Sequence, residues 1–143
     1  MKKLLFLTLL FLISFATFSQ NRYTSTYNQL GYWNKVTEKW DWEDIKYATI
    51  PITFNKNVVT FENKASSKYI ITSDQTKRTG VNSDGDSYTR YSWFVKDNSN
   101  RRCTLNITIL ENDEYDPIIS IMYDDVCIRY YIGTTKNYGI DKF

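Results

Sequence analysis

Between residues 88 and 132, four successive runs of the chain alternate apolar with polar or small side chains, at 88–96, 102–110, 118–123 and 126–132. Alternation with a period of two is typical of β-strands that bury one face. Short polar turns separate the runs, so the sequence predicts an antiparallel up-and-down meander of four strands. In the expected registers Val95 lies opposite Cys103 and Ile109 lies opposite Ile119.

A second hairpin is expected upstream of the meander. Ile52 and Phe54 alternate with polar residues, and Lys56-Asn57 is expected to form a two-residue turn. This turn places Phe54 opposite Val59 and Ile52 opposite Phe61. All four side chains then point inward, which favours this register over its neighbours.

The predicted fold class is all-β. Segments 39–43 and 68–72 are further candidate strands, which brings the total to about eight. The 12 Tyr, 8 Phe and 4 Trp agree with this, because aromatic side chains fit the pleated surface of a sheet. We predict a small antiparallel up-and-down barrel or a strongly coiled two-layer sheet. The barrel is favoured because closure removes exposed strand edges.

The first 19 residues predict a cleavable signal helix. Lys2 and Lys3 precede an apolar run at 4–13, and small residues lead to a cleavage site before Gln20. The run is shorter than the roughly 20 residues that cross a bilayer, so cleavage is favoured over a membrane anchor and no span is expected afterwards. The product is expected to be periplasmic or extracellular. Its predicted parts are a loose leader at 20–30, a single β domain at 31–135 and a tail at 136–143.

Removal of the signal peptide changes the net charge. The full sequence has 18 basic and 16 acidic residues. Lys2 and Lys3 leave with the signal peptide and no acid does, so 16 residues of each sign remain. A chain that is neutral overall has no general attraction for nucleic acid. We therefore predict no nucleic-acid partner.

The residue types present restrict the possible chemistry. The chain contains no histidine and two cysteines, which excludes imidazole-activated nucleophiles, histidine-ligated metals and four-thiolate sites. Its five glycines are scattered, so no phosphate-binding loop is present. We predict no catalytic residue, metal site or cofactor. In the acidic segment 82–86 glycine stands at the fourth position, whereas a calcium loop has it at the sixth, so a turn is favoured.

Cys103 and Cys127 are the candidate disulfide. An exported protein normally oxidises such a pair. The predicted registers oppose the bond, because Cys103 faces inward, Cys127 faces outward and a third strand separates them. That separation is roughly 9–10 Å, against an upper limit of about 7 Å between Cα atoms. A bulge at Asp124-Asp125 is the change that would permit the bond, so both states stay open.

Trp40 and Trp42 are two residues apart, so both project from one face of their strand. Buried, they belong to the core, which is the favoured interpretation because tryptophan is usually buried. Exposed, they bind a sugar ring or another flat ligand, with Trp33 as a third candidate. Gly31-Tyr32-Trp33 resembles the Gly-x-Trp motif of lipocalins, which are ligand-binding up-and-down barrels. The resemblance covers three residues, implies that architecture and does not assign the family.

The favoured function is a non-catalytic secreted or periplasmic β domain that binds a partner protein or a small ligand. One alternative is a glycosidase-like hydrolase with two carboxylates, for which Asp41 with Glu43 and Asp124 with Asp125 are nominal pairs. Another is a structural or inhibitory protein of the cell envelope. The sequence leaves the partner and the oligomeric state open.

Overall fold

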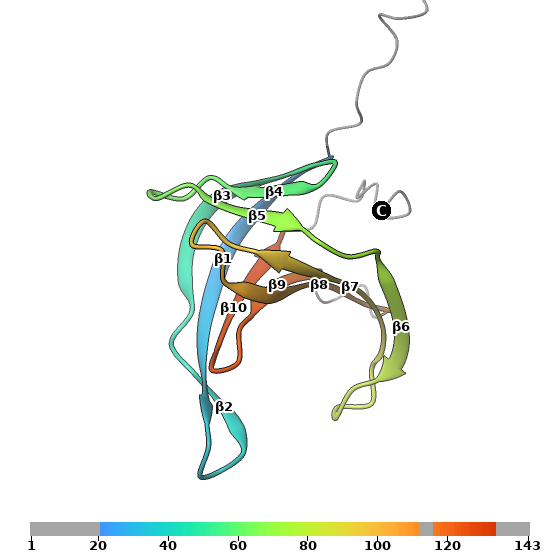
Figure 1. The fold of residues 1–143 in the computed structure, drawn as a ribbon. Helices are drawn as coiled ribbons and strands as arrows, with labels where there is room; N and C mark the ends of the chain where they lie inside the picture. The colour runs from blue at the N-terminus through green and yellow to red at the C-terminus, as the bar shows by residue number, and fades with distance from the viewer. Residues whose placement is uncertain (1–20, 112–115, 134–143) are drawn as a thin grey trace, which may run out of the picture.

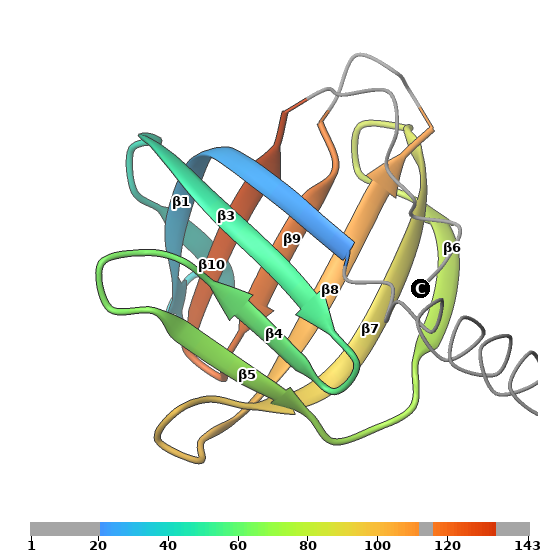
Figure 2. The same ribbon diagram turned by 90° about the horizontal axis from the view of Figure 1, so that it is seen from above.

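The computed structural model of the protein describes residues 21–111 and 116–133. Within these ranges the chain forms one antiparallel sheet of ten strands, eight of which close into a barrel (Figures 1 and 2). The all-β fold and the barrel are therefore confirmed. The strands are β1 (Asn21–Asn34), β2 (Lys39–Trp42), β3 (Lys46–Asn55), β4 (Val58–Phe61), β5 (Ser67–Ile71), β6 (Thr76–Val81), β7 (Ser87–Lys96), β8 (Arg102–Leu110), β9 (Ile118–Met122) and β10 (Val126–Ile132).

Neighbouring barrel strands follow the order β10-β9-β8-β7-β5-β4-β3-β1, and pairing of β1 with β10 closes the ring. In Figure 2, strands β3, β4 and β5 lie across β8, β9 and β10 on the opposite side of the barrel. The predicted signal peptide at 1–19 and tail at 136–143 lie outside the described residues.

The meander of β7, β8, β9 and β10 forms as predicted, with Val95 opposite Cys103. One register differs from the prediction: Ile119 lies opposite Ile107, not opposite Ile109. The pairing of β8 with β9 begins only at Thr108, which lies opposite Ile118. A shift of two residues keeps every side chain on its predicted face, so the inward pattern is unchanged.

The hairpin of β3 and β4 has the predicted register. Phe54 lies opposite Val59 and Ile52 opposite Phe61, and all four side chains are buried. Phe61 also contacts Tyr130 of β10, with ring centroids 4.5 Å apart. Since β3 and β1 separate β4 from β10 in the ring, this contact crosses the barrel. Side chains therefore fill the interior at this level.

The predicted loose leader at 20–30 is wrong from Asn21 onward, because these residues form most of β1. Tyr23 and Ser25 are buried and pair with Ile52 and Ile50 of β3. An irregularity between Ser25 and Tyr27 then turns the strand toward β10. The segment looks polar because its outward positions face water. Its inward positions and its backbone ladders to two neighbours make it a structural strand.

Two strands lie outside the ring. β2 pairs with the end of β1, and β6 pairs with the first half of β7. In Figure 1, β2 at the lower left and β6 at the right extend on the same side, with β7 to β10 between them. We call the surface on this side the outer face, formed by the outward side chains of β6 to β10, β1 and β2. Residues 21–111 and 116–133 include no helix of the length and apolarity that a membrane crossing needs.

Candidate ligand-binding site

Three tryptophans gather at the β2 side of the outer face. Trp33 lies opposite Trp40 in the pairing of β1 with β2, and their ring centroids are 5.4 Å apart. The ring of Trp42 is 6.0 Å from that of Trp40. We call these three residues the tryptophan cluster. None belongs to the buried core, and Trp33 is 36% exposed, so the favoured interpretation of Trp40 and Trp42 as core residues is wrong.

The ring of Trp42 is held in place from two sides. It lies over Gly31, where a Cβ atom would come within 2.6 Å of the indole. The guanidinium carbon of Arg129, on β10, lies 3.7 Å from the ring centroid. Such a stack combines cation–π attraction with the packing of two flat groups. Gln29 fixes the start of the β2–β3 connection, because its Nε2 donates a hydrogen bond to the carbonyl of Glu43 (2.9 Å).

A similar arrangement occurs at the opposite flank, beside β6. Tyr88 lies over Gly80, where a Cβ atom would come within 2.8 Å of the phenol oxygen. The guanidinium of Arg90 lies 5.1 Å from the Tyr88 ring, and its Nε donates to Oγ1 of Thr108 (3.1 Å). Arg78 lies directly opposite Arg90 in the pairing of β6 with β7. Each flank therefore has an arginine beside an aromatic ring that covers a glycine.

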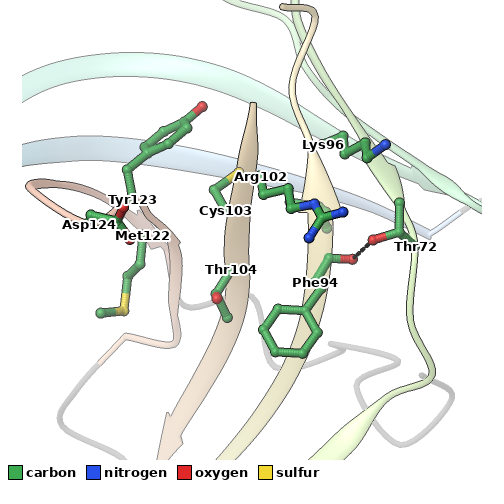
Figure 3. A pocket seen from close by; sticks show the side chains of 10 residues that line it. Thr72, Phe94, Lys96, Arg102, Cys103, Thr104, Met122, Tyr123 and Asp124 are labelled. Atoms are coloured by element: carbon green, nitrogen blue, oxygen red, sulfur yellow. Dashed lines mark hydrogen bonds between the residues drawn. The ribbon is translucent and has the colours of Figure 1, made fainter. Parts of the chain in front are cut away.

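Between the flanks, the outer face holds an open pocket of about 680 Å³ (Figure 3). Phe94, Thr104 and Met122 project to this side of the sheet, whereas Cys103 and Tyr123 project to the other side. Phe94 is 65% exposed although it stands in the middle of the sheet. Lys96, Arg102 and Asp124 complete the polar part of the lining. The pocket therefore combines an apolar floor with a mainly cationic rim.

Cys103 and Cys127 are both buried and both free. Cys103 belongs to the core of the barrel. Cys127 pairs with Met122, which pairs in turn with Thr104, so Cys127 lies on the outer face. The two thiols thus project from opposite faces of the sheet, as the predicted registers require. Burial raises the pKa of both thiols, which opposes thiolate formation.

The segment 82–86 forms the predicted turn. The side-chain oxygen of Asn82 accepts hydrogen bonds from the backbone amides of Asp84 (3.0 Å) and Asp86 (2.8 Å), and Gly85 has φ +90°. Among the described residues, no three His, Cys, Asp or Glu side chains are grouped so as to hold a metal ion.

The nominal hydrolase acids have other roles in the structure. Asp41 accepts a hydrogen bond from the Asn34 side chain (2.8 Å), and Glu43 pairs with Lys46 (3.0 Å). Asp124 and Asp125 lie in the exposed turn between β9 and β10. Asp41 projects from the opposite face of β2, and Asp124 lies in the pocket lining, whereas the outward positions of β6 to β10 carry no acid.

The sequence identified the three tryptophans but not Arg129, Arg90 or Arg78. Their signal appears only when the strands are assembled, because Arg78 meets Arg90 across a ladder and Arg129 reaches Trp42 over the intervening strand β1. In comparisons with known proteins, no family model matches the chain, and no curated protein or solved structure matches it. The candidate site therefore rests on the geometry of this chain alone.

Proposed function

We propose that the protein is a non-catalytic binding domain that recognises carbohydrate on its outer face, through the tryptophan cluster. The observation that carries the proposal is the grouping of three partly exposed indoles on one face, one of them fixed between Gly31 and Arg129. Aromatic rings held in place, such as Trp33 and Trp40 beside the anchored Trp42, are suited to the apolar face of a sugar ring, because they bind it with little loss of side-chain entropy.

Polar groups beside the cluster support a hydroxylated ligand over a purely apolar partner. Gln29 and Arg129 lie opposite each other at outward positions of β1 and β10, on the same face as the cluster. These groups donate and accept hydrogen bonds. Ligand pockets that combine aromatic walls with a few convergent polar groups follow the same pattern.

The packed interior supports binding outside the barrel. Phe61 and Tyr130 meet across it, and Leu105, Ile107 and Ile121 on the far wall are almost completely buried. The lipocalin resemblance would imply a ligand inside the barrel, whereas the tryptophans on which our proposal rests project from its outside. Export to the periplasm or the cell exterior belongs to the proposal and rests on the charged and apolar pattern of residues 1–19.

Titration of the purified protein with cello-, chito- and galacturonate oligosaccharides, followed by tryptophan fluorescence and calorimetry, tests the proposal. We expect one of these series to bind, and Trp40→Ala or Trp42→Ala to weaken binding by about tenfold, roughly 1.4 kcal/mol. Trp93→Phe is the matched control, because Trp93 is buried in the core. The proposal fails if no series binds, or if the control weakens binding as much as the two cluster variants.

A further inference from the structure

We propose that the outer face binds an acidic polysaccharide, whose carboxylate or sulfate groups are held by two pairs of cationic side chains along β7. One pair is Arg78 with Arg90 and the other is Lys96 with Arg102. We call these four residues the cationic track. The inference deepens the proposed function and rests on it only in placing a carbohydrate on the outer face.

The outward positions of the seven strands of the outer face differ in charge from the chain as a whole. They carry six cationic side chains and no acid, although the full sequence has almost equal numbers of each. The one acid within these strands, Asp41, occupies the opposite face of β2, where it pairs with Tyr32. A mainly positive surface on a neutral protein attracts anionic ligands locally.

Both pairs in the cationic track place like charges directly opposite each other. Arg78 faces Arg90 across β6 and β7, and Lys96 faces Arg102 across β7 and β8. Like charges in this position destabilise a sheet. Among the described residues, no carboxylate oxygen lies within 4.0 Å of a charged nitrogen of the four side chains. An anionic group bound between the members of each pair would relieve the repulsion.

The spacing of the pairs suits an extended ligand. Arg90 and Lys96 are six residues apart on one strand, which corresponds to roughly 20 Å. Ser92 and Phe94 are the outward β7 residues between them, and the pocket beside Phe94 has both Lys96 and Arg102 in its lining. Arg90 is also fixed in advance by Thr108 and by the Tyr88 ring. A linear chain with acidic groups at intervals would contact both pairs.

The side chains along the track favour an acidic sugar chain over single-stranded nucleic acid. Nucleic-acid platforms stack successive bases on successive aromatic rings. Between the two pairs, Phe94 is the exposed ring among the outward residues of β7 and β8, and its neighbours there are Ser92 and Thr104. Hydroxyl groups on both sides of a single ring fit a chain of hydroxylated rings.

The test uses the purified protein with four probes at matched ionic strength: polygalacturonate, dextran sulfate, uncharged dextran and oligothymidylate. We expect binding to polygalacturonate or dextran sulfate, and these two probes distinguish carboxylate from sulfate. Arg78→Gln with Arg90→Gln, or Lys96→Gln with Arg102→Gln, should weaken it about tenfold. Each pair of substitutions should also lower the slope of log K against log salt by about two, because each lost contact removes about one unit.

The matched control is Lys64→Gln with Lys68→Gln, which removes two exposed positive charges from the loop before β5 and from β5 itself. Equal weakening by the control would show a general charge effect and overturn the inference, as would preferential binding of oligothymidylate. If a neutral oligosaccharide binds, requires Trp40 and Trp42, and is indifferent to the cationic track, the inference is wrong while the proposed function stands. Circular dichroism of each variant confirms that it is folded.

Discussion

The guanidinium carbon of Arg129 lies 3.7 Å from the ring centroid of Trp42. Arg129 belongs to β10 and Trp42 to β2, so the contact joins two strands that are separated by β1. Because Trp42 also covers Gly31 of that intervening strand, arginine and glycine together fix the indole on the outer face. The tryptophan cluster is thus organised before any ligand arrives, which lowers the entropic penalty of binding.

Substitution of Gly31 should disturb the cluster more than the barrel. In Gly31→Ala, the new methyl group would meet the Trp42 indole at 2.6 Å and displace it. We expect oligosaccharide binding to fall at least about fivefold, because the displaced Trp42 no longer supports Trp40 and the loss of one aromatic contact is worth roughly 1 kcal/mol. The tryptophan fluorescence should also change. Gly133→Ala is the matched control, since its methyl group meets Thr26 instead. An unchanged affinity in Gly31→Ala would contradict the assigned role of Trp42.

Charge reversal at Arg78 should raise the stability of the protein and lower its affinity for the acidic polysaccharide. In Arg78→Glu the carboxylate would lie opposite Arg90, which replaces repulsion by attraction across the ladder. We expect the free energy of unfolding to rise by roughly 0.3–1 kcal/mol, while affinity for the acidic polysaccharide falls. Urea unfolding and the binding assay measure the two effects.

Lys77→Glu is the control for charge reversal. It makes the same change one residue earlier, where Lys77 lies 5.6 Å from the Tyr91 ring on the opposite face. This variant should lose stability, because it removes a cation–π contact. A loss of stability in Arg78→Glu would refute the like-charge interpretation of the pair.

The two cysteines are expected to be free and slow to react. They project from opposite faces of the sheet, and burial raises the pKa of both thiols. Alkylation of the native protein should therefore be slow, and denaturation without reductant should release two reactive thiols. Intact mass before and after alkylation measures this. A mass two hydrogens lower, with no alkylation after denaturation, would show that Cys103 and Cys127 are bonded.

Stability should fall at alkaline pH because of buried tyrosines. Burial raises the pKa of Tyr23 from 10.0 to about 12. Burial also raises the pKa of Tyr130 and of Tyr123, and Asp97, which accepts the hydrogen bond of the Tyr123 hydroxyl, adds to the latter shift. In the unfolded chain these phenols ionise near pH 10, so the folded state holds more protons above that value. Their contribution is complete below about pH 9 and is lost as the pH rises from 10 toward 12.

Urea unfolding at a series of pH values, together with tyrosinate absorbance, tests the alkaline prediction. Tyr123→Phe removes one of the phenols that ionise late and should reduce the slope of stability against pH. Tyr47→Phe is the control, since Tyr47 is 84% exposed. A stability that stays constant up to pH 12 would be inconsistent with the burial of these phenols.

Period-two alternation predicted the strands that bury one face, so β7 to β10 and the β3–β4 hairpin followed from the sequence. β1 did not, since its buried positions are Tyr23, Ser25 and Gly31 and most residues of its first half are polar. Only the closed ring shows that this segment lies between β3 and β10. β6 has no buried residue to mark it. Its existence depends on the ladder to β7, which local pattern does not encode.

The candidate site was only partly predictable, because local spacing does not determine which strands lie side by side. Spacing placed Trp40 and Trp42 on one face, but whether that face was buried depended on β2 lying outside the ring. The approach of Arg129 to Trp42, and of Arg78 to Arg90, depends on strand order and register. Pairwise arrangement across strands is a tertiary property, so composition and spacing do not supply it.

The indole N–H resonances test the central claim most directly. The protein has four tryptophans, of which Trp33, Trp40 and Trp42 form the cluster and Trp93 is buried in the core at 8% exposure. Two-dimensional proton–nitrogen spectra, assigned with single Trp→Phe variants, are recorded during titration with oligogalacturonate. We predict that the three cluster resonances shift in saturable fashion while that of Trp93 stays in place. A shift at Trp93 with the cluster unmoved would place the ligand inside the barrel and contradict the account.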